Sequence, residues 1–186
     1  MCPRWPGALS WLTAPGNQNS RQGEPPGAAP QAAPKSRGYF GHQIRLKGEN
    51  ILRVVVQNIN SISEEPNSKD DKDLLAFVRN HQIDIMCLLE LNKCWKYVDP
   101  SIRIPEHFRG FWEALHHSVA YNQHSKSQVA HQHGGEAILS FDQAAYRNPQ
   151  RGCDPSGLGR WAWTRFRGRQ GTSFRVVCSY CPCDGN

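Results

Sequence analysis

The chain has 186 residues, of which 38% are hydrophobic, and carries a formal net charge of +6. This length fits one domain with a tail, and no apolar run is long enough to cross a bilayer, so no membrane partner is expected. The seven cysteines are an odd number without a repeating spacing, which excludes a small disulfide scaffold and favours the nucleus or cytoplasm. The basic charge suits a polyanionic partner such as nucleic acid, and equally a protein with a few extra surface arginines.

The first 48 residues differ in composition from the rest. Pro, Gly, Ala, Gln and Ser dominate the stretch 14–38, and such a composition buries too little apolar surface to offset chain entropy. We therefore predict a disordered tail over residues 1–48 and a folded domain over 49–186. Prolines and a glycine interrupt the few apolar residues near the N-terminus, so we predict no secretory signal and an intracellular protein.

The domain is predicted to begin with a βαβ unit. The β-branched run 51–56 indicates a strand buried on both faces, in the centre of a sheet. Ser68 and Asp71 have the spacing of a capping box, which predicts a helix that ends near residue 80. The apolar run 83–89 predicts a second strand. Since the connections are short, the two strands should be parallel.

Two polar side chains follow the two strands of this unit. Asn58 and Glu90 are the first polar residues beyond the predicted strand ends. Parallel strands place their C-terminal ends on one edge of the sheet, which is where open α/β sheets bind ligands. We therefore expect Asn58 and Glu90 to lie together.

The second half of the domain is less regular. We expect a short strand at 111–115, an exposed loop over 116–134, a strand over 135–141, a loop over 148–159, and an antiparallel hairpin made by 160–167 and 174–180. A parallel first part followed by antiparallel hairpins predicts an α/β or α+β sandwich of mixed β-sheets flanked by helices.

Four motifs occur in a fixed order. They are Gln-Asn58-Ile-Asn-Ser, Leu-Leu-Glu90-Leu-Asn, the strand Gly-Gly-Glu-Ala-Ile-Leu, and a hairpin closing on Ser-Tyr180-Cys-Pro. This order resembles the endonuclease/exonuclease/phosphatase superfamily, which has the DNase I-like fold. The likeness is greatest to endonuclease domains of non-LTR retrotransposons, because Glu90, Asn92 and Trp95 are similar to a Glu-x-Asn-x-x-Trp variant of some of those elements.

The resemblance implies Mg²⁺-dependent hydrolysis of phosphodiester bonds in DNA, with Mn²⁺ as an alternative ion. Glu90 would be the metal ligand, since Mg²⁺ prefers carboxylate oxygen. Asn58 would orient a metal-bound water or a phosphate oxygen, and Asn60 matches the family's second Asn loosely. Tyr180 would contact the scissile phosphate, or it packs on the core as strand-end aromatic residues often do.

The sequence also departs from the family pattern. Leu89 and Leu91 flank Glu90 where Gln and Thr are usual. The family's later Asp-x-Asn motif and final Asp-His pair are not found after Tyr180, and Asp184-Gly185-Asn186 follows too soon to supply the first. The resemblance therefore implies the N-terminal half of such a domain, truncated, with an incomplete catalytic site. Two alternatives stay open: a phosphatase of the same superfamily acting on small phosphoesters, and a catalytically dead nucleic-acid-binding remnant.

Arginine and aromatic residues share the last hairpin. Arg160, Arg165 and Arg167 are candidate contacts to the DNA phosphate backbone, with neighbouring aromatic residues suited to base stacking. A surface hairpin with a buried aromatic face explains the same pattern equally well. The last cysteines lack the paired spacing of a zinc site.

Overall fold

The computed structural model describes residues 44–123, 131–147 and 150–180. Its elements are β1 (Val54–Asn58), α1 (Lys69–Asn80), β2 (Ile85–Leu89), the 3-10 turn η1 (Pro100–Ile102), α2 (Ile104–Phe108), β3 (Leu115–Ala120), β4 (Glu136–Phe141), α3 (Asp142–Tyr146), β5 (Gln150–Cys153), β6 (Trp161–Arg167), the 3-10 turn η2 (Arg169–Gly171) and β7 (Ser173–Ser179). Most of the predicted tail, residues 1–43, lies outside the described residues, so the boundary at residue 48 stays a prediction. Within the described ranges, no helix has the length and apolarity needed to cross a membrane.

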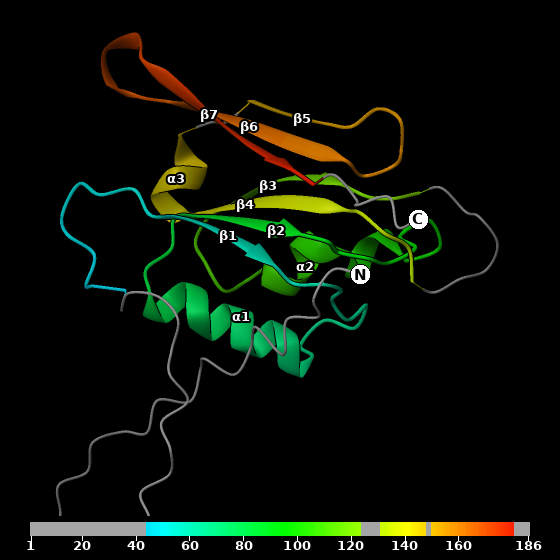
Figure 1. The fold of residues 1–186 in the computed structure, drawn as a ribbon. Helices are drawn as coiled ribbons and strands as arrows, with labels where there is room; N and C mark the ends of the chain where they lie inside the picture. The colour runs from blue at the N-terminus through cyan, green and yellow to red at the C-terminus, as the bar shows by residue number, and fades with distance from the viewer. Residues whose placement is uncertain (1–43, 124–130, 148–149, 181–186) are drawn as a thin grey trace, which may run out of the picture.

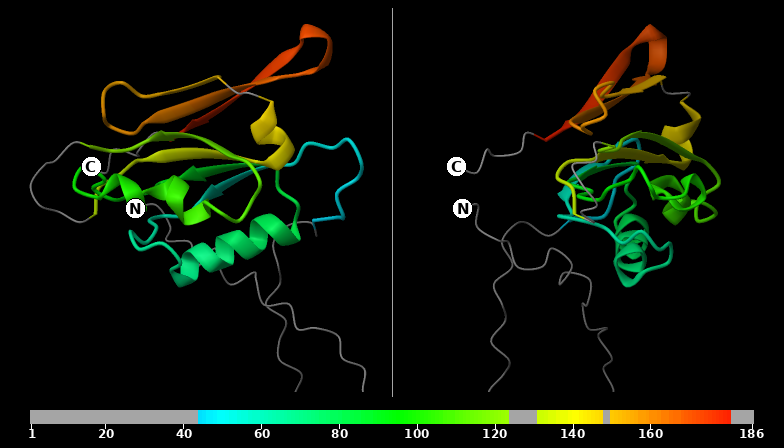
Figure 2. Two further views of the ribbon diagram at one scale, coloured as in Figure 1. Left: turned by 180° about the vertical axis from the view of Figure 1, so that it is seen from behind. Right: turned by 90° about the vertical axis from the view of Figure 1, so that its right-hand side faces the viewer.

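Two sheets stack on each other, and α1 and α2 lie on the face of the larger sheet that is turned away from the smaller one (Figure 1, Figure 2). The larger sheet has the order β1-β2-β4-β3, and the smaller one has the order β5-β6-β7. β1 and β2 are parallel, whereas β4 pairs antiparallel with both β2 and β3. The predicted α+β sandwich with a mixed sheet is therefore confirmed at this level.

The βαβ unit forms as the sequence predicts. The Ser68 hydroxyl accepts a hydrogen bond from the Asp71 backbone amide at 3.2 Å, and the Asp71 carboxylate accepts one from the Ser68 amide at 3.3 Å. This capping box satisfies two amides that the first turn of a helix leaves unpaired. α1 ends at Asn80, and its apolar face packs on the sheet through Leu74 and Val78, which are both buried.

A buried polar pair joins the two helices. Asp71 and His107 are both fully buried, and Nδ1 of His107 lies 2.9 Å from a carboxylate oxygen of Asp71. The other ring nitrogen of His107 lies 3.0 Å from the carbonyl oxygen of Ile102. Because buried polar groups need partners, this arrangement fixes α2 against the start of α1.

The prediction that the run 51–56 is a central strand buried on both faces is wrong. The strand begins at Val54 and lies at the edge of the larger sheet, with Val54 and Val56 exposed at 42% and 63%. Val55 points to the other face and packs on the core under α1. The smaller sheet packs through β5 and β6 on β3 and β4, and through β7 on β2 and β4. Its described strands therefore leave the second face of β1 largely in solvent.

Three expectations for the second half are also corrected. Only residue 115 of the expected strand 111–115 is in a strand, and that strand continues through the expected loop to Ala120. The sequence does not predict this strand because two histidines and a serine interrupt its apolar pattern. Ser118 is nevertheless buried, and its hydroxyl donates to the carbonyl of Gly152 at 2.9 Å. The expected loop 148–159 contains β5, a polar edge strand whose position depends on pairing with β6.

The final hairpin forms as predicted, but its aromatic residues divide between the two faces of the sheet. Ala162, Thr164 and Phe166 of β6 face the larger sheet and are buried. Phe166 stacks on Phe174 of β7 with ring centroids 5.0 Å apart. The alternating residues Trp161 and Trp163 lie on the outer face. A buried aromatic face therefore does not explain the two tryptophans.

Candidate functional site

Asn58 and Glu90 meet at one edge of the larger sheet, as parallel pairing predicts. Asn58 lies opposite Leu89 in the register of β1 and β2, and Glu90 follows directly. The side-chain amide of Asn58 donates a hydrogen bond to Oε1 of Glu90 at 2.6 Å. Asn58 is exposed and Glu90 is half-buried, so this pair lies where solvent and a substrate can reach it.

Asn92 connects this pair to the loops around it. Its side-chain nitrogen donates to Oε2 of Glu90 and to Oδ1 of Asn60, each at 3.2 Å. Its Oδ1 accepts from the backbone amide of Gly134 at 3.0 Å. Asn92 is 1% exposed. The carboxylate of Glu90 is thus held at both oxygens by amide groups from two different strand ends.

The backbone around these side chains is unusual. Asn60, Ser61, Glu90 and Asn92 all have positive φ angles, of 46°, 96°, 58° and 46°. Residues with a Cβ adopt the left-handed region of backbone conformation at a cost. The short side chain of Asn reduces this cost by local hydrogen bonds, whereas the longer side chain of Glu does not. Backbone bonds compensate here: the amide of Ser61 donates to the Glu90 carbonyl at 2.8 Å, and that of Asn92 donates to the Gly134 carbonyl at 2.9 Å. Such conformations cluster at functional sites, where the surrounding structure enforces them.

A second carboxyl group lies beneath this edge. Glu136, the first residue of β4, is fully buried, and its Oε2 accepts from the thiol of Cys178 at 3.1 Å. Its Oε1 is one of the buried polar atoms that has no hydrogen-bond partner among the described residues. Burial raises the pKa of Glu136 to about 7, the nearby charge of Glu90 adds to this, and hydrogen bonds from Cys178 and the Glu90 backbone oppose it. Glu136 can therefore hold a proton near neutral pH.

Tyr180 and Arg160 belong to the same end of the sandwich. The Cys178 thiol lies 3.7 Å from the carbonyl of Leu88, which places the end of β7 over the end of β2. Tyr180 follows β7, is half-buried, and its backbone amide donates to the carbonyl of Arg160 at 3.2 Å. The structure therefore brings both backbones to the end at which Glu90 lies.

Arg165 and Arg167 lie elsewhere. They are near the far end of β6, next to the turn that joins β6 to β7, and strands rise about 3.3 Å per residue. They are thus separated from Arg160 by most of a strand length. The three arginines proposed from the sequence as nucleic-acid contacts therefore lie at the two ends of β6, and their role stays a prediction.

The residues at the edge fit a hard divalent ion. Each oxygen of Glu90 accepts one amide hydrogen bond and keeps a lone pair for a ligand. Mg²⁺ often binds proteins through one or two carboxylates and otherwise keeps waters or takes substrate phosphate oxygens, so one fixed carboxylate suits it. In the part of the chain that the structure describes, no three His, Cys, Asp or Glu side chains gather in a way that could hold a metal by themselves. Glu90 is thus the candidate ligand, and water or substrate would complete the coordination.

Sequence reasoning assigned no role to two residues of this site. Asn92 stands within the Glu-x-Asn-x-x-Trp pattern, but its function as a link between Glu90 and Asn60 depends on loops 32 residues apart. Glu136 stands within Gly-Gly-Glu-Ala-Ile-Leu, where a charged residue inside an apolar strand was the available signal.

No protein-family model matches the sequence, and no curated protein is similar enough to count as a relative.

Proposed function

We propose that this edge of the sheet binds Mg²⁺ for phosphodiester hydrolysis of DNA, on a DNase I-like sandwich of the kind found in non-LTR retrotransposon endonucleases. The observation that supports it best is the carboxylate of Glu90, held by the amides of Asn58 and Asn92 at the ends of two parallel strands. A carboxylate fixed in this way is pre-organised for a cation, and it lies where a substrate has access.

The side chains have distinct roles in this proposal. A bound Mg²⁺ would neutralise charge on the phosphate and lower the pKa of a coordinated water. Glu90 would hold the ion. Asn58 uses one N–H of its amide to orient Glu90, which leaves the second N–H to donate to a phosphate oxygen. Tyr180, at the same end of the sandwich, would contact the phosphate from β7.

The described residues supply the metal-binding side of such a site. The side chains that hydrogen-bond to the Glu90 carboxylate in the described structure are the amides of Asn58 and Asn92, which do not act as general bases. The proposal therefore concerns the metal-binding side of a phosphodiesterase site, with Glu90 as its ligand. The arginines on the smaller sheet favour a nucleic-acid substrate over a small phosphoester, because they are spread along a strand over a distance that one small phosphoester does not span.

Metal binding tests the proposal most directly. We expect Glu90→Gln to weaken Mn²⁺ binding at least tenfold, measured by electron paramagnetic resonance of free Mn²⁺ with Mg²⁺ as competitor, because the charged ligand that the proposal assigns to the ion is lost. Glu113→Gln removes an exposed carboxylate from a loop outside the site and serves as the matched control. Equal Mn²⁺ affinity in the wild-type chain and Glu90→Gln would remove Glu90 from the site.

The reaction class needs a separate experiment. Supercoiled plasmid and a phosphomonoester are offered in parallel with Mg²⁺, and again with excess EDTA. The proposal expects EDTA-sensitive nicking above the Glu90→Gln background and no release of phosphate. Release of phosphate without nicking would instead support the phosphatase alternative.

A further inference from the structure

One face of the smaller sheet carries an unusual set of side chains. Residues that alternate with the buried positions of β6 point away from the larger sheet, and those directly across on β7 share their face. We call this surface the outer hairpin face. Its aromatic and charged residues are Trp161, Trp163, Arg165, Arg167 and Arg175, and Ser173, Val177 and Ser179 of β7 complete it. The three arginines are exposed and the two tryptophans are half-buried. It is turned away from the larger sheet and from α1 and α2 (Figure 2).

The arginines of this face repel one another. Arg165 and Arg175 are direct cross-strand partners, and Arg167 lies two residues farther along β6. The ion pairs found in the described residues include none of these three. Like charges placed directly opposite each other destabilise a sheet. A bound polyanion would remove this cost, which makes the charge pattern complementary to nucleic acid.

The tryptophans make a stacking surface beside these charges. The guanidinium carbon of Arg175 lies 4.3 Å from the ring centroid of Trp163, which is a close cation–π contact. Position 152 is a glycine, and a Cβ there would overlap the indole nitrogen of Trp163, so Gly152 makes room for the ring on the sheet. Trp161 lies on the same face nearer the start of β6. Aromatic rings and arginine planes of this kind stack unpaired bases, which a duplex does not offer.

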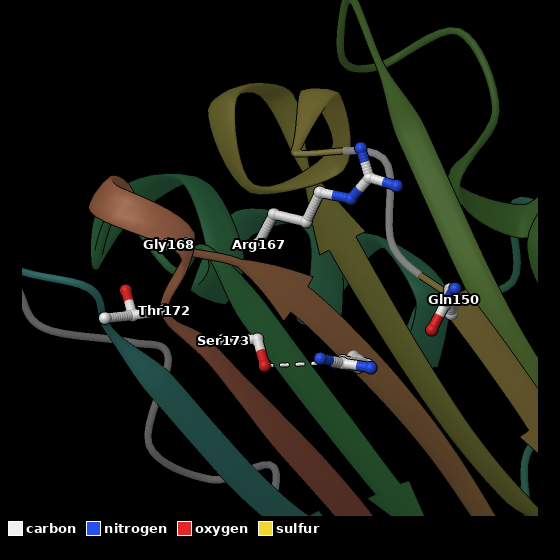
Figure 3. A pocket seen from close by; sticks show the side chains of 7 residues that line it. Gln150, Arg167, Gly168, Thr172 and Ser173 are labelled. Atoms are coloured by element: carbon white, nitrogen blue, oxygen red, sulfur yellow. Dashed lines mark hydrogen bonds between the residues drawn. The ribbon is translucent and has the colours of Figure 1, made fainter.

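The charged end of the face contains a pocket of about 390 Å³. It is lined by Gln150, Arg165, Arg167, Gly168, Gly171, Thr172 and Ser173 (Figure 3). Nε of Arg165 donates to the hydroxyl of Ser173 at 3.0 Å, which fixes the guanidinium at the pocket. Two guanidinium groups with hydroxyl and amide groups around them are the donors that a phosphate group takes.

We propose that the outer hairpin face binds single-stranded nucleic acid, with a phosphate in the pocket between Arg165 and Arg167 and bases over Trp163–Arg175 and Trp161. This inference goes beyond the proposed hydrolysis and does not depend on it. The face is on the smaller sheet, and its pocket lies at the opposite end of the sandwich from Glu90. Binding should therefore persist without metal.

The test is fluorescence anisotropy of 5′-fluorescein-labelled dT20 in EDTA, with the full chain fused to a soluble carrier and the carrier alone as the blank. We expect Arg165→Ser with Arg175→Ser to weaken binding at least tenfold at 100 mM salt. The slope of log affinity against log salt should fall in magnitude by about 0.7, because Arg165 contacts the phosphate in the pocket and each single-strand phosphate contact contributes roughly 0.7. Trp161→Leu should weaken binding about tenfold and leave the slope unchanged, because it removes stacking and no charge.

Lys69→Ser with Lys72→Ser is the matched control, since it removes two exposed charges from α1 on the other side of the molecule. It should change affinity less than twofold. An equal loss in this control, or tighter binding of a blunt duplex of the same length, would overturn the proposal. If the arginine variant unfolds, the wild-type salt slope decides: the one phosphate contact of the proposal requires a magnitude of about 0.7 or more, and a slope near zero rejects it. The proposal would also be rejected if analytical ultracentrifugation showed that the wild-type chain associates with itself and does not bind dT20.

Discussion

The side-chain amide of Asn58 donates to the carboxylate of Glu90 across 2.6 Å, although the two residues are 32 positions apart in the chain. This contact exists because two parallel strands end at the same edge of a sheet. A third residue, Asn92, holds the other carboxylate oxygen and both neighbouring loops. The site is therefore a rigid assembly in which Glu90 has little freedom to turn away, and its parts can be tested separately.

The first prediction concerns Asn92. Its replacement by Ala removes three hydrogen bonds from a buried position and leaves the Gly134 amide unpaired, so we expect a loss of about 2–3 kcal/mol in the free energy of unfolding. Asn92→Gly loses the same bonds but adopts the φ of 46° without strain, and should be about 1 kcal/mol less damaging than Ala. Urea unfolding measures both. Asn80→Ala, at the exposed end of α1, is the control, and equal stability of Asn92→Ala and Asn80→Ala would contradict the assigned role.

The second prediction concerns the pH dependence due to Glu136. Its pKa is about 7 in the folded protein against an ordinary value of 4.5, so between these values the folded state binds a proton that the unfolded state has lost. The contribution of Glu136 to the free energy of unfolding therefore falls by roughly 3 kcal/mol in all as the pH rises from 4.5 to 7. It is constant above pH 7. Burial lowers the pKa of His117 from 6.5 to about 4. The contribution of His117 to the free energy of unfolding therefore rises as the pH rises between these two values, which is opposite to the contribution of Glu136.

Since both groups titrate, the measurement compares variants. The stability of Glu136→Gln relative to wild type should rise by roughly 3 kcal/mol between pH 4.5 and pH 8, because this variant cannot lose a proton and His117 is the same in both. Glu113→Gln, which changes an exposed carboxylate, should follow the wild-type curve. A constant difference between Glu136→Gln and wild type over this range would show that Glu136 titrates normally.

The third prediction concerns the open face of β1. Val54 and Val56 are exposed on an edge strand, and unpaired apolar edges promote aggregation. Changing both to Thr keeps β-branched side chains, so we expect higher soluble yield and less light scattering on heating, with the unfolding midpoint nearly unchanged. Val55→Thr, on the face that packs under α1, should instead destabilise by about 1–2 kcal/mol. If Val54→Thr with Val56→Thr loses as much stability as Val55→Thr, the open face is covered in solution.

The fourth prediction compares two glycines near the site. Gly157 and Gly159 have φ angles of 74° and 68°, so Ala is strained at both. A Cβ at Gly157 has open space, whereas one at Gly159 would lie 2.7 Å from the backbone nitrogen of Asn122 and 2.9 Å from that of Gly135. We expect Gly157→Ala to cost about 1 kcal/mol and Gly159→Ala at least twice as much, measured by thermal unfolding. Equal losses would mean that the backbone at Gly159 can move aside.

Local patterns in the sequence were sufficient for much of the first half of the domain. The capping box of Ser68 and Asp71 defined where α1 begins, because those bonds form within four residues. The apolar run ending at Leu89 predicted β2, and the short connections predicted parallel pairing with β1. The meeting of Asn58 and Glu90 follows from that pairing alone. The family resemblance and its catalytic roles stay a proposal.

The tertiary structure decided which surfaces are covered. The sequence predicted a strand at 51–56 but not that it lies at an edge with Val56 in solvent, since this depends on how far the smaller sheet extends over the larger one. Likewise, the alternation in β6 indicated two faces, and only packing on the larger sheet showed that Phe166 points inward and Trp163 outward. The raised pKa of Glu136 arises between two sheets that meet only in the folded protein. Short-range bonds are encoded in neighbouring residues, whereas burial and its electrostatic effects belong to contacts between segments far apart in the chain.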